Sequence, residues 1–451
     1  MIAATAVTLG ATGGVLVATA GANGASSPGC GAHVTTNVTL TSDIGPCPPN
    51  TDGIVIAANG ITVNLNGHRI VGTDTTNATK QEQVGVRFLN VYNSTVQGPG
   101  EVTQFDAGVF IDGGGNDTVT GVTADANIAH VLLTGGVNPS DPEATPCNLG
   151  DGITTNNSSG NTISDSSATN NGPYSGISLV GASTNNTVSG NDSYNNDVSN
   201  ILSGTTTSGP CGPFGASKVG QGRPHQDIGI RIEGPGATGN VLDGNTSTGN
   251  QLEGISIHSN VCPKSGPKVP QGTPPNTNNM VENNTVSGNG FADDTDGIAI
   301  LEQGPAGVVC PATNNSIANN TSNSNARDGV FVGGRGASGN VVTGNTTDSN
   351  GKDGVELNGG SFSGVLGMAL SGATGDTVSG NTANGNAKYG IALDGPTGTG
   401  TTAAPGAIDN TVTGNTASGN VTWDGYDGNP GCDNNTWSMD TFGTVNQACV
   451  Q

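Results

Sequence analysis

The sequence predicts an all-β solenoid, a single-stranded coil of short parallel strands. Gly makes up 76 of the 451 residues and charged residues only 10%, which is typical of short strands and turns. A phrase close to Asn-Asn-Thr-Val-Ser-Gly-Asn recurs along the chain, for example from Asn185. A second phrase, Gly-Ile/Val-x-apolar, recurs with it, and 23 residues separate Gly85 from Gly108 while 25 separate Gly229 from Gly254. A fixed period of this length indicates a repeat architecture.

Within each period, apolar residues alternate with period two over a few positions, which predicts short strands and no helix. In a parallel coil, equivalent positions stack ~4.8 Å apart, so inward Val and Ile would form aliphatic ladders. The recurrent Asn would form amide ladders at the turns, and the recurrent Gly would occupy positions of positive φ. Roughly a dozen coils are expected.

Composition divides the chain into four parts. Residues 1–25 are small and apolar and end in candidate cleavage residues, which is typical of a secretory signal peptide; a disordered tail is the alternative. Residues 26–53 and 423–451 are expected to cap a solenoid that spans 54–422. No other segment resembles a membrane span.

Eight Cys fit an exported, secreted protein, and none has the Cys-x-x-Cys spacing of a zinc or redox site. Spacing is a weak guide to pairing, but short terminal loops favour the first two of the following pairs and leave the others for long loops. The favoured pairs are Cys30–Cys47, Cys432–Cys449, Cys147–Cys211 and Cys262–Cys310.

The net charge of the chain limits the classes of partner that it is expected to bind. Twelve Lys and Arg against 35 Asp and Glu give a net charge of −23. A surface this acidic repels nucleic acid and anionic membranes, so neither is expected to be a general partner.

The phrases Asn-Thr-Val-Ser-Gly-Asn and Gly-Ile-x-Leu, together with the run from Ile54 to His68, resemble a known repeat. They are similar to the right-handed parallel β-helix of the pectate-lyase-like superfamily, including NosD-like and uronan-epimerase-like members. The resemblance covers residues 34–425 and implies the fold, which hosts lyases, hydrolases, epimerases, adhesins and non-catalytic shells. The epimerase Asp-Pro-His-Glu signature is missing, because Asp141-Pro-Glu143 lacks the His, and so is the polygalacturonase Gly-His-Gly element. No catalytic residue is therefore carried over.

Four long segments interrupt the repeat, at 135–150, 203–226, 259–277 and 302–313, each just after the same kind of strand. They are expected to leave the coil on one side, where a solenoid usually carries its function.

Five of the twelve Lys and Arg lie between positions 218 and 268, which predicts a local positive pocket for an anionic substrate. The alternative is that they only solubilise long loops. The residues assigned to substrate binding are Lys218, Arg223, His225 and Lys264.

The strand pattern predicts a catalytic cluster. In Gly-Ile-x-Ile-x the x positions point outward, so Arg231 and Glu233 should lie beside His258 of the next coil, with Glu302 nearby. His258 would act as base, Arg231 would bind a substrate carboxylate, and Glu233 would orient the base or act as acid. For hydrolysis, Glu233 and Glu302 would be the carboxylate pair. The alternative is a surface ion-pair cluster without catalysis.

A second ladder holds acids before the strand Gly. Such acids are first a turn signal, and stacked carboxylates repel unless they are protonated, screened or bound to cations. Ca²⁺ is the candidate cofactor, at Asp293, Asp294 and Asp296 or at Asp424 and Asp427, whereas the scattered His and Met fit no copper site. The ladder consists of Asp52, Asp151, Glu253, Asp296, Asp328 and Asp353.

Together these features favour a secreted, monomeric carbohydrate-active enzyme that acts on an acidic, uronate-containing polysaccharide as a β-eliminating lyase. A hydrolase or epimerase on the same fold is the first alternative. A non-catalytic cell-surface or matrix-binding protein is the second.

Overall fold

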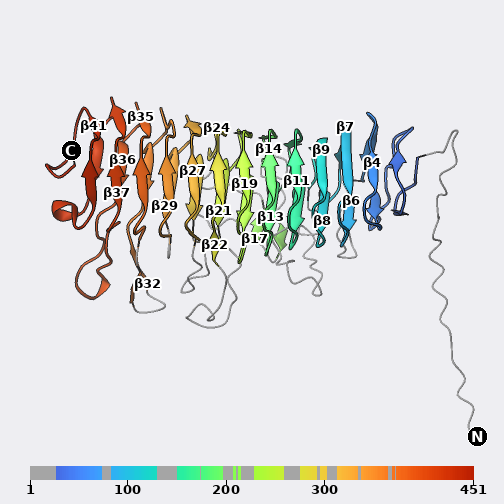
Figure 1. Ribbon diagram of the computed structural model, residues 1–451, viewed down its shortest axis with the longest axis horizontal. Helices are drawn as coiled ribbons and strands as arrows, with labels where there is room; N and C mark the ends of the chain where they lie inside the picture. Colours follow the sequence, from blue (N-terminus) through green and yellow to red (C-terminus); the bar gives the residue numbers. More distant parts are fainter. Residues whose placement is uncertain are drawn as a thin grey trace, which may run out of the picture.

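The computed structural model of the chain is a rod of stacked strands, with its long axis crossing the strands (Figure 1). Each turn of the coil is here called a rung, and each rung contributes one strand to the first sheet described below. The structure describes residues 27–73, 83–128, 150–172, 174–196, 207–209, 212–214, 228–258, 275–291, 295–301, 312–333, 337–363, 368–370 and 372–450.

Sheet 1 has thirteen strands, all parallel in the pairs between neighbours, so the described residues span thirteen rungs. Its strands, in spatial order, are β1 (Ala32–Val34), β3 (Ile54–Ile56), β6 (Val84–Leu89), β8 (Ala107–Asp112), β10 (Ile153–Asn156), β13 (Ser175–Val180), β18 (Ile228–Glu233), β21 (Ile255–His258), β25 (Ile298–Leu301), β29 (Val330–Gly333), β31 (Val355–Leu357), β36 (Tyr389–Leu393) and β39 (Trp423–Asp427).

Two further parallel sheets complete each rung. Strands β7 (Thr95–Thr103) and β9 (Thr118–Asp125) are long enough to belong to both. Sheet 2 also contains β2 (Val38–Thr39), β4 (Thr62–Asn64), β11 (Thr162–Ser164), β14 (Thr187–Ser189), β19 (Val241–Asp243), β23 (Met280–Glu282), β27 (Ser316–Ala318), β30 (Val341–Thr343), β34 (Thr377–Ser379), β37 (Thr411–Thr413) and β40 (Thr436–Ser438). Sheet 3 also contains β5 (Arg69–Val71), β12 (Ser167–Thr169), β15 (Asp192–Tyr194), β20 (Thr246–Thr248), β24 (Thr285–Ser287), β28 (Thr321–Asn323), β35 (Thr382–Asn384), β38 (Thr416–Ser418) and β41 (Thr441–Phe442).

Three short strand pairs and two single-turn 3₁₀ helices lie outside these sheets. Among the described residues, no helix is long and apolar enough to cross a membrane. The pairs are β16 (Thr207–Gly209) with β17 (Gly212–Phe214), β22 (Asn276–Thr277) with β26 (Ala312–Thr313), and β32 (Ser361–Ser363) with β33 (Met368–Leu370), and the helices are Gly400–Thr402 and Pro430–Cys432.

The core is the aliphatic ladder that the alternation predicted. Ile230 and Ile232 of β18 stack on Ile255 and Ile257 of β21, and all four side chains are fully buried. The residues between them therefore lie on the outer face of sheet 1. The all-β solenoid predicted from the sequence is confirmed.

Buried Asn side chains form three ladders at the turns. In one of them, the Asn284 backbone N–H and side-chain amide both donate to Asn320 Oδ1, and Asn320 donates in the same way to Asn345 Oδ1. Most of these amides also donate to a backbone carbonyl, as Asn320 does to Val281. Because these side chains satisfy buried backbone groups, the repeated Asn is part of the interior of the fold.

The recurrent Gly residues serve two different purposes, which corrects the expectation that they share positive φ angles. Gly288, in the Ser-Gly-Asn phrase, has a φ of +65°. Gly297, before a sheet 1 strand, has no positive φ, but a Cβ there would lie 2.1 Å from Ser322 Oγ and 2.3 Å from Asn325 Nδ2. The second kind of Gly thus makes room for the Asn ladder rather than for a special backbone conformation.

Disulfide bonds join Cys30 to Cys47 and Cys432 to Cys449, the two terminal pairs favoured from the sequence. The other four Cys, at 147, 211, 262 and 310, lie outside the described residues.

Candidate functional site

The structure brings three of the predicted catalytic residues together on the outer face of sheet 1. Arg231 pairs in register with Ser256, and Glu233 pairs with His258 on the next rung. Tyr174, which directly precedes β13, completes the group. These five residues, Tyr174, Arg231, Glu233, Ser256 and His258, are called the Glu233 cluster below.

One carboxylate oxygen is the centre of this cluster. Glu233 Oε2 accepts a hydrogen bond from the Tyr174 hydroxyl, forms an ion pair of 2.9 Å with Arg231 and lies 3.3 Å from His258 Nε2. The Arg231 guanidinium stacks on the Tyr174 ring, 3.7 Å from its centroid. The other imidazole nitrogen, His258 Nδ1, lies 3.2 Å from Ser256 Oγ. Carboxylate, imidazole and hydroxyl are therefore linked in a row.

The cluster is buried, whereas the strand pattern predicted residues that face solvent. Arg231 is 0% exposed, and Glu233 and His258 are each 1% exposed. The side chains lie on the outer face of the sheet because they alternate with the core Ile residues, but that face is covered at this point. The cluster is a buried ion network and not the surface ion-pair cluster that was the alternative.

The surroundings of Glu233 keep it ionised. Burial alone would raise its pKa, but the hydrogen bond and charge of His258, together with the charge of Arg231, outweigh burial and lower the pKa to about 2. Burial and the nearby Glu233 charge raise the pKa of Tyr174 well above its usual value, so its hydroxyl remains a donor. Glu233 is thus suited to orient His258 and unsuited to act as a general acid, and Tyr174 is the available proton donor.

Asp151 lies beside the cluster, and its pKa is shifted in the opposite direction from that of Glu233. Its Oδ2 accepts hydrogen bonds from Thr154 (2.8 Å) and Ser178 (2.9 Å). Burial raises the pKa of Asp151 to about 7, against these hydrogen bonds and the charge of Arg231.

This difference predicts how stability depends on pH. Folded Asp151 keeps its proton up to pH ~7, whereas in the unfolded chain it ionises near pH 3.8, so its contribution to stability is lost as pH rises between these values. In Asp151→Asn, the loss of unfolding free energy between pH 4.5 and 8 should be smaller by about 3 kcal/mol. Urea unfolding at both pH values measures it. The exposed change Asp192→Asn is the control, and equal losses in wild type and Asp151→Asn would contradict the prediction.

The acidic ladder continues along sheet 1 as a set of backbone acceptors. The Asp328 N–H donates to Asp296 Oδ1, the Asp353 N–H donates to Asp328 Oδ1, and the Tyr389 N–H donates to Asp353 Oδ1. Burial raises the pKa of Asp296 to about 7 and that of Asp328 well above its usual value. The expected repulsion between stacked acids is therefore relieved in part by protonation.

Two cations relieve the rest. Arg327 Nε lies 3.2 Å from Asp328 and Arg327 Nη2 lies 3.2 Å from Glu356, while the Lys352 ammonium lies 3.6 Å from Asp328, 3.1 Å from Asp353 and also contacts Glu356. Burial opposes ionisation of Glu356, but Asp328, Lys352 and Arg327 lower its pKa to about 2. These five residues are called the Lys352 cluster below.

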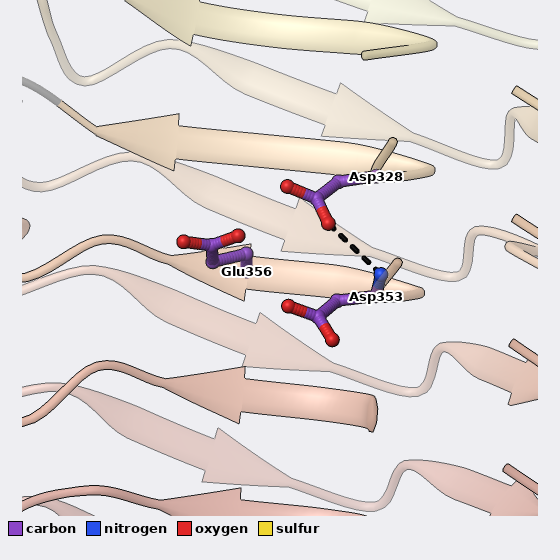
Figure 2. Close-up of side chains that lie close together, drawn as sticks. All are labelled: Asp328, Asp353 and Glu356. Carbon is purple, nitrogen blue, oxygen red and sulfur yellow. Dashed lines mark hydrogen bonds between the residues drawn. The ribbon is translucent and has the colours of Figure 1, made fainter. Parts of the chain in front are cut away.

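The same carboxylates are the one group among the described residues with the spacing of a metal site. Oxygens of Asp328, Asp353 and Glu356 lie within 4.8 Å of one another, the two Asp on successive rungs and Glu356 farther along the strand (Figure 2). The Lys352 ammonium contacts all three carboxylates, so it already supplies the positive charge there, and the group fits a divalent cation poorly.

The predicted Ca²⁺ residues do not form such a group in the described part of the chain. Asp293 and Asp294 lie outside it, and Asp296 faces Arg327 at 3.7 Å. Asp424 accepts hydrogen bonds from Asn420, and Asp427 accepts one from Trp437, so these two acids act within the Asn ladder and the C-terminal end of the rod.

Comparison with known proteins identifies the architecture. No protein-family model and no curated protein matches the chain. Among solved structures, the A-module of the mannuronan C-5 epimerase AlgE6 from Azotobacter vinelandii is 16% identical over 94% of this chain and 91% of the module, with a TM-score of 0.53. The chain is a right-handed parallel β-helix. The Dettilon tailspike protein is 20% identical, with a TM-score of 0.51, over 85% of this chain and 59% of the tailspike. At these identities the likeness shows the fold alone.

Several predicted site residues of the β-helix lie outside the described residues. They are Lys218, Arg223, His225, Lys264 and Glu302.

Sequence reasoning missed Tyr174 and the two cations of the Lys352 cluster. Tyr174 lies one position before Ser175, which is the residue that aligns with Asp151 of the acidic ladder, so the repeat pattern did not single out Tyr174. Arg327 and Lys352 each directly precede an acid of the ladder, and their places on successive rungs could have been read from the 25-residue spacing.

Proposed function

We propose that this β-helix is an enzyme that acts on an acidic, uronate-containing polysaccharide by removing the proton beside the sugar carboxylate. The observation that supports this most is the convergence of Tyr174, Arg231 and His258 on one oxygen of Glu233. Burying an ion network costs desolvation energy, and a hydrophobic cluster of the same volume often stabilises a fold as well or better. Such a network in one stretch of a repetitive sheet is therefore more typical of a functional site than of a device for stability.

The residues have distinct roles in this proposal. Glu233 accepts a hydrogen bond from His258 Nε2–H, which leaves Nδ1 as the basic nitrogen, 3.2 Å from the Ser256 hydroxyl. In β-elimination, the base takes the C5 proton, the electron pair forms the C4–C5 double bond, and the C4–O bond breaks. Tyr174 protonates the departing oxygen, and Arg231 balances the charge that develops on the substrate carboxylate.

The geometry favours a lyase over an epimerase. A lyase removes a proton from one ring atom and delivers one to the oxygen on the neighbouring atom. Tyr174 and His258 Nε2 both contact Glu233 Oε2, so the acid is separated from the basic Nδ1 by this oxygen and the imidazole ring. An epimerase needs its acid and base on opposite faces of the sugar ring. The AlgE6 module, which shares the fold, is named as an epimerase, so epimerisation is the first alternative.

Burial favours a second candidate, a non-catalytic matrix-binding β-helix in which the Glu233 cluster holds three successive rungs together. Catalysis requires that polysaccharide binding uncover the outer face of β18 and β21. The two disulfide bonds support an extracellular location for either function.

The deciding experiment follows ultraviolet absorbance of unsaturated uronate products from pectate, alginate and glycosaminoglycans. We expect activity on one of these polymers, and His258→Ala should lower kcat by about 10²- to 10⁴-fold. Because His258 is buried against Glu233, the variant is assayed at a temperature where circular dichroism shows that it is folded. The change His68→Ala, at a half-buried residue far from this cluster in the chain, is the control and should retain activity.

Three outcomes would contradict the assignment. Full activity in His258→Ala would remove His258 from the site. Epimerised product without unsaturated ends would replace the lyase by an epimerase. Polymer binding without any turnover would favour the matrix-binding protein.

A further inference from the structure

We propose that Arg327, Lys352 and Lys388, with Tyr389 and Tyr426, form a second site on this β-helix, a ladder that binds the carboxylates of an acidic polysaccharide lying along sheet 1. This site would bind the same class of polysaccharide as the proposed enzyme, and binding there does not require that the protein be catalytic. The site lies toward the C-terminal end of the rod from the Glu233 cluster, since β25 separates β21 from β29.

The three cations occupy equivalent positions on three successive rungs. The Lys352 N–H donates to the Arg327 carbonyl at 2.7 Å, and the Lys388 N–H donates to the Lys352 carbonyl at 2.8 Å. Their side chains therefore recur at the rung spacing of ~4.8 Å. This spacing is comparable to the length of one pyranose unit in an extended polysaccharide, so successive uronate carboxylates can meet successive cations.

Unlike the Glu233 cluster, these cations reach solvent. The side chains of Arg327 and Lys352 are 29% and 27% exposed, and Lys388 is half-buried. The carboxylates beneath them are almost fully buried, with Asp328 at 0% and Glu356 at 1%. Buried acids thus hold the cationic groups in place at the surface, which lowers the entropy cost of ordering them around a ligand.

The underlying acids offset part of the positive charge, because Arg327 and Lys352 form ion pairs with Asp328 and Glu356. Of the acids around the cations, Glu356 has a pKa lowered to about 2, whereas burial raises the pKa of Asp296 to about 7 and that of Asp394 to about 6. Burial also raises the pKa of Asp328 and Asp353. At neutral pH the ionised Glu356 and the mostly ionised Asp394 offset part of the charge of the three cations, on a chain whose net charge is −23.

An aromatic pair extends the ladder by one rung. The rings of Tyr389 and Tyr426 stack with centroids 4.2 Å apart and 3° between their planes, and the Lys388 ammonium lies 4.3 Å from the Tyr389 centroid. Tyr426 is half-buried and keeps part of its surface in solvent. A cation beside an aromatic surface suits a sugar that presents both a carboxylate and an apolar C–H face.

The test is direct binding by isothermal titration of alginate and pectate oligosaccharides, with dextran as the neutral control. Using the His258→Ala background prevents turnover. We expect acidic oligosaccharides to bind, dextran not to bind, and added salt to weaken the binding. Lys388→Glu should weaken binding at least about tenfold, because it places a like charge beside the ligand.

Arg69→Glu is the matched control, since Arg69 is an exposed cation on β5, away from sheet 1, and it should bind as before. Tyr426→Ala is the second variant and should also weaken binding, which keeps the test decisive if Lys388→Glu fails to fold. Unchanged binding in a folded Lys388→Glu or Tyr426→Ala, or no binding of acidic oligosaccharides at all, would overturn the proposal. Binding with the expected losses but no turnover by the wild type would retain this ladder and refute the proposed enzyme.

Discussion

Arg231→Met is expected to lower the free energy of unfolding by about 3–5 kcal/mol, because it leaves an ionised carboxylate buried without its cation. Glu233 is 1% exposed, and removal of Arg231 leaves burial, which raises its pKa, opposed only by the contacts with His258 and Tyr174. The Tyr174 ring also loses the guanidinium stacked on it at 3.7 Å. Guanidinium chloride unfolding at pH 7 measures the effect.

A surface ion pair provides the comparison. Arg69 pairs with Glu101 at 2.9 Å, but its side chain is 48% exposed, so Arg69→Met should cost less than about 1 kcal/mol. The double variant Arg231→Met/Glu233→Gln should recover most of the stability lost in Arg231→Met, because it removes both charges. If Arg231→Met lowers the free energy of unfolding no more than Arg69→Met does, then Arg231 does not stabilise a buried charge on Glu233.

Asn320→Ala is expected to lower the free energy of unfolding by about 3–5 kcal/mol, because it removes three buried hydrogen bonds. The Asn284 backbone N–H and side-chain amide lose their acceptor, and the Val281 carbonyl loses its donor. Each buried group left unsatisfied costs about 1–3 kcal/mol. Chemical unfolding measures the loss.

The neighbouring residue is the matched control. Asn319 is exposed and has a φ of +55°, so Asn319→Ala should cost about 1 kcal/mol through backbone strain alone. Equal losses for the two substitutions would show that the amide ladder adds nothing beyond turn preference.

The repeat carried most of the information about the fold. Because each rung repeats the same apolar and Asn positions, strand faces and amide ladders follow from alignment of the phrases, and the placement of Arg231 beside Ser256 followed from the same register. The burial of this site did not follow, because it depends on what packs against the outer face and that is not periodic. Tyr174 was missed for a related reason, since 57 residues separate it from Arg231 although they are neighbours in space.

Two kinds of Gly show the limit of reading a residue from its pattern alone. Both recur with the period, and from sequence both fit a turn. The requirement at Gly297 comes from Ser322 and Asn325 of the next rung, which only a three-dimensional register reveals.

The Asn ladders also keep the spacing between rungs constant along the rod. Successive ladder residues are 25 positions apart between Asn161 and Asn186 but 54 apart between Asn186 and Asn240, and each step is made by the same pair of amide contacts. Distance along the axis is therefore counted in rungs and not in residues, and loops of any length can leave the coil without changing the pitch. A polymer aligned with the axis would therefore meet equivalent side-chain positions at a constant spacing. Duplication of one rung would add one such position and lengthen the rod by one strand spacing.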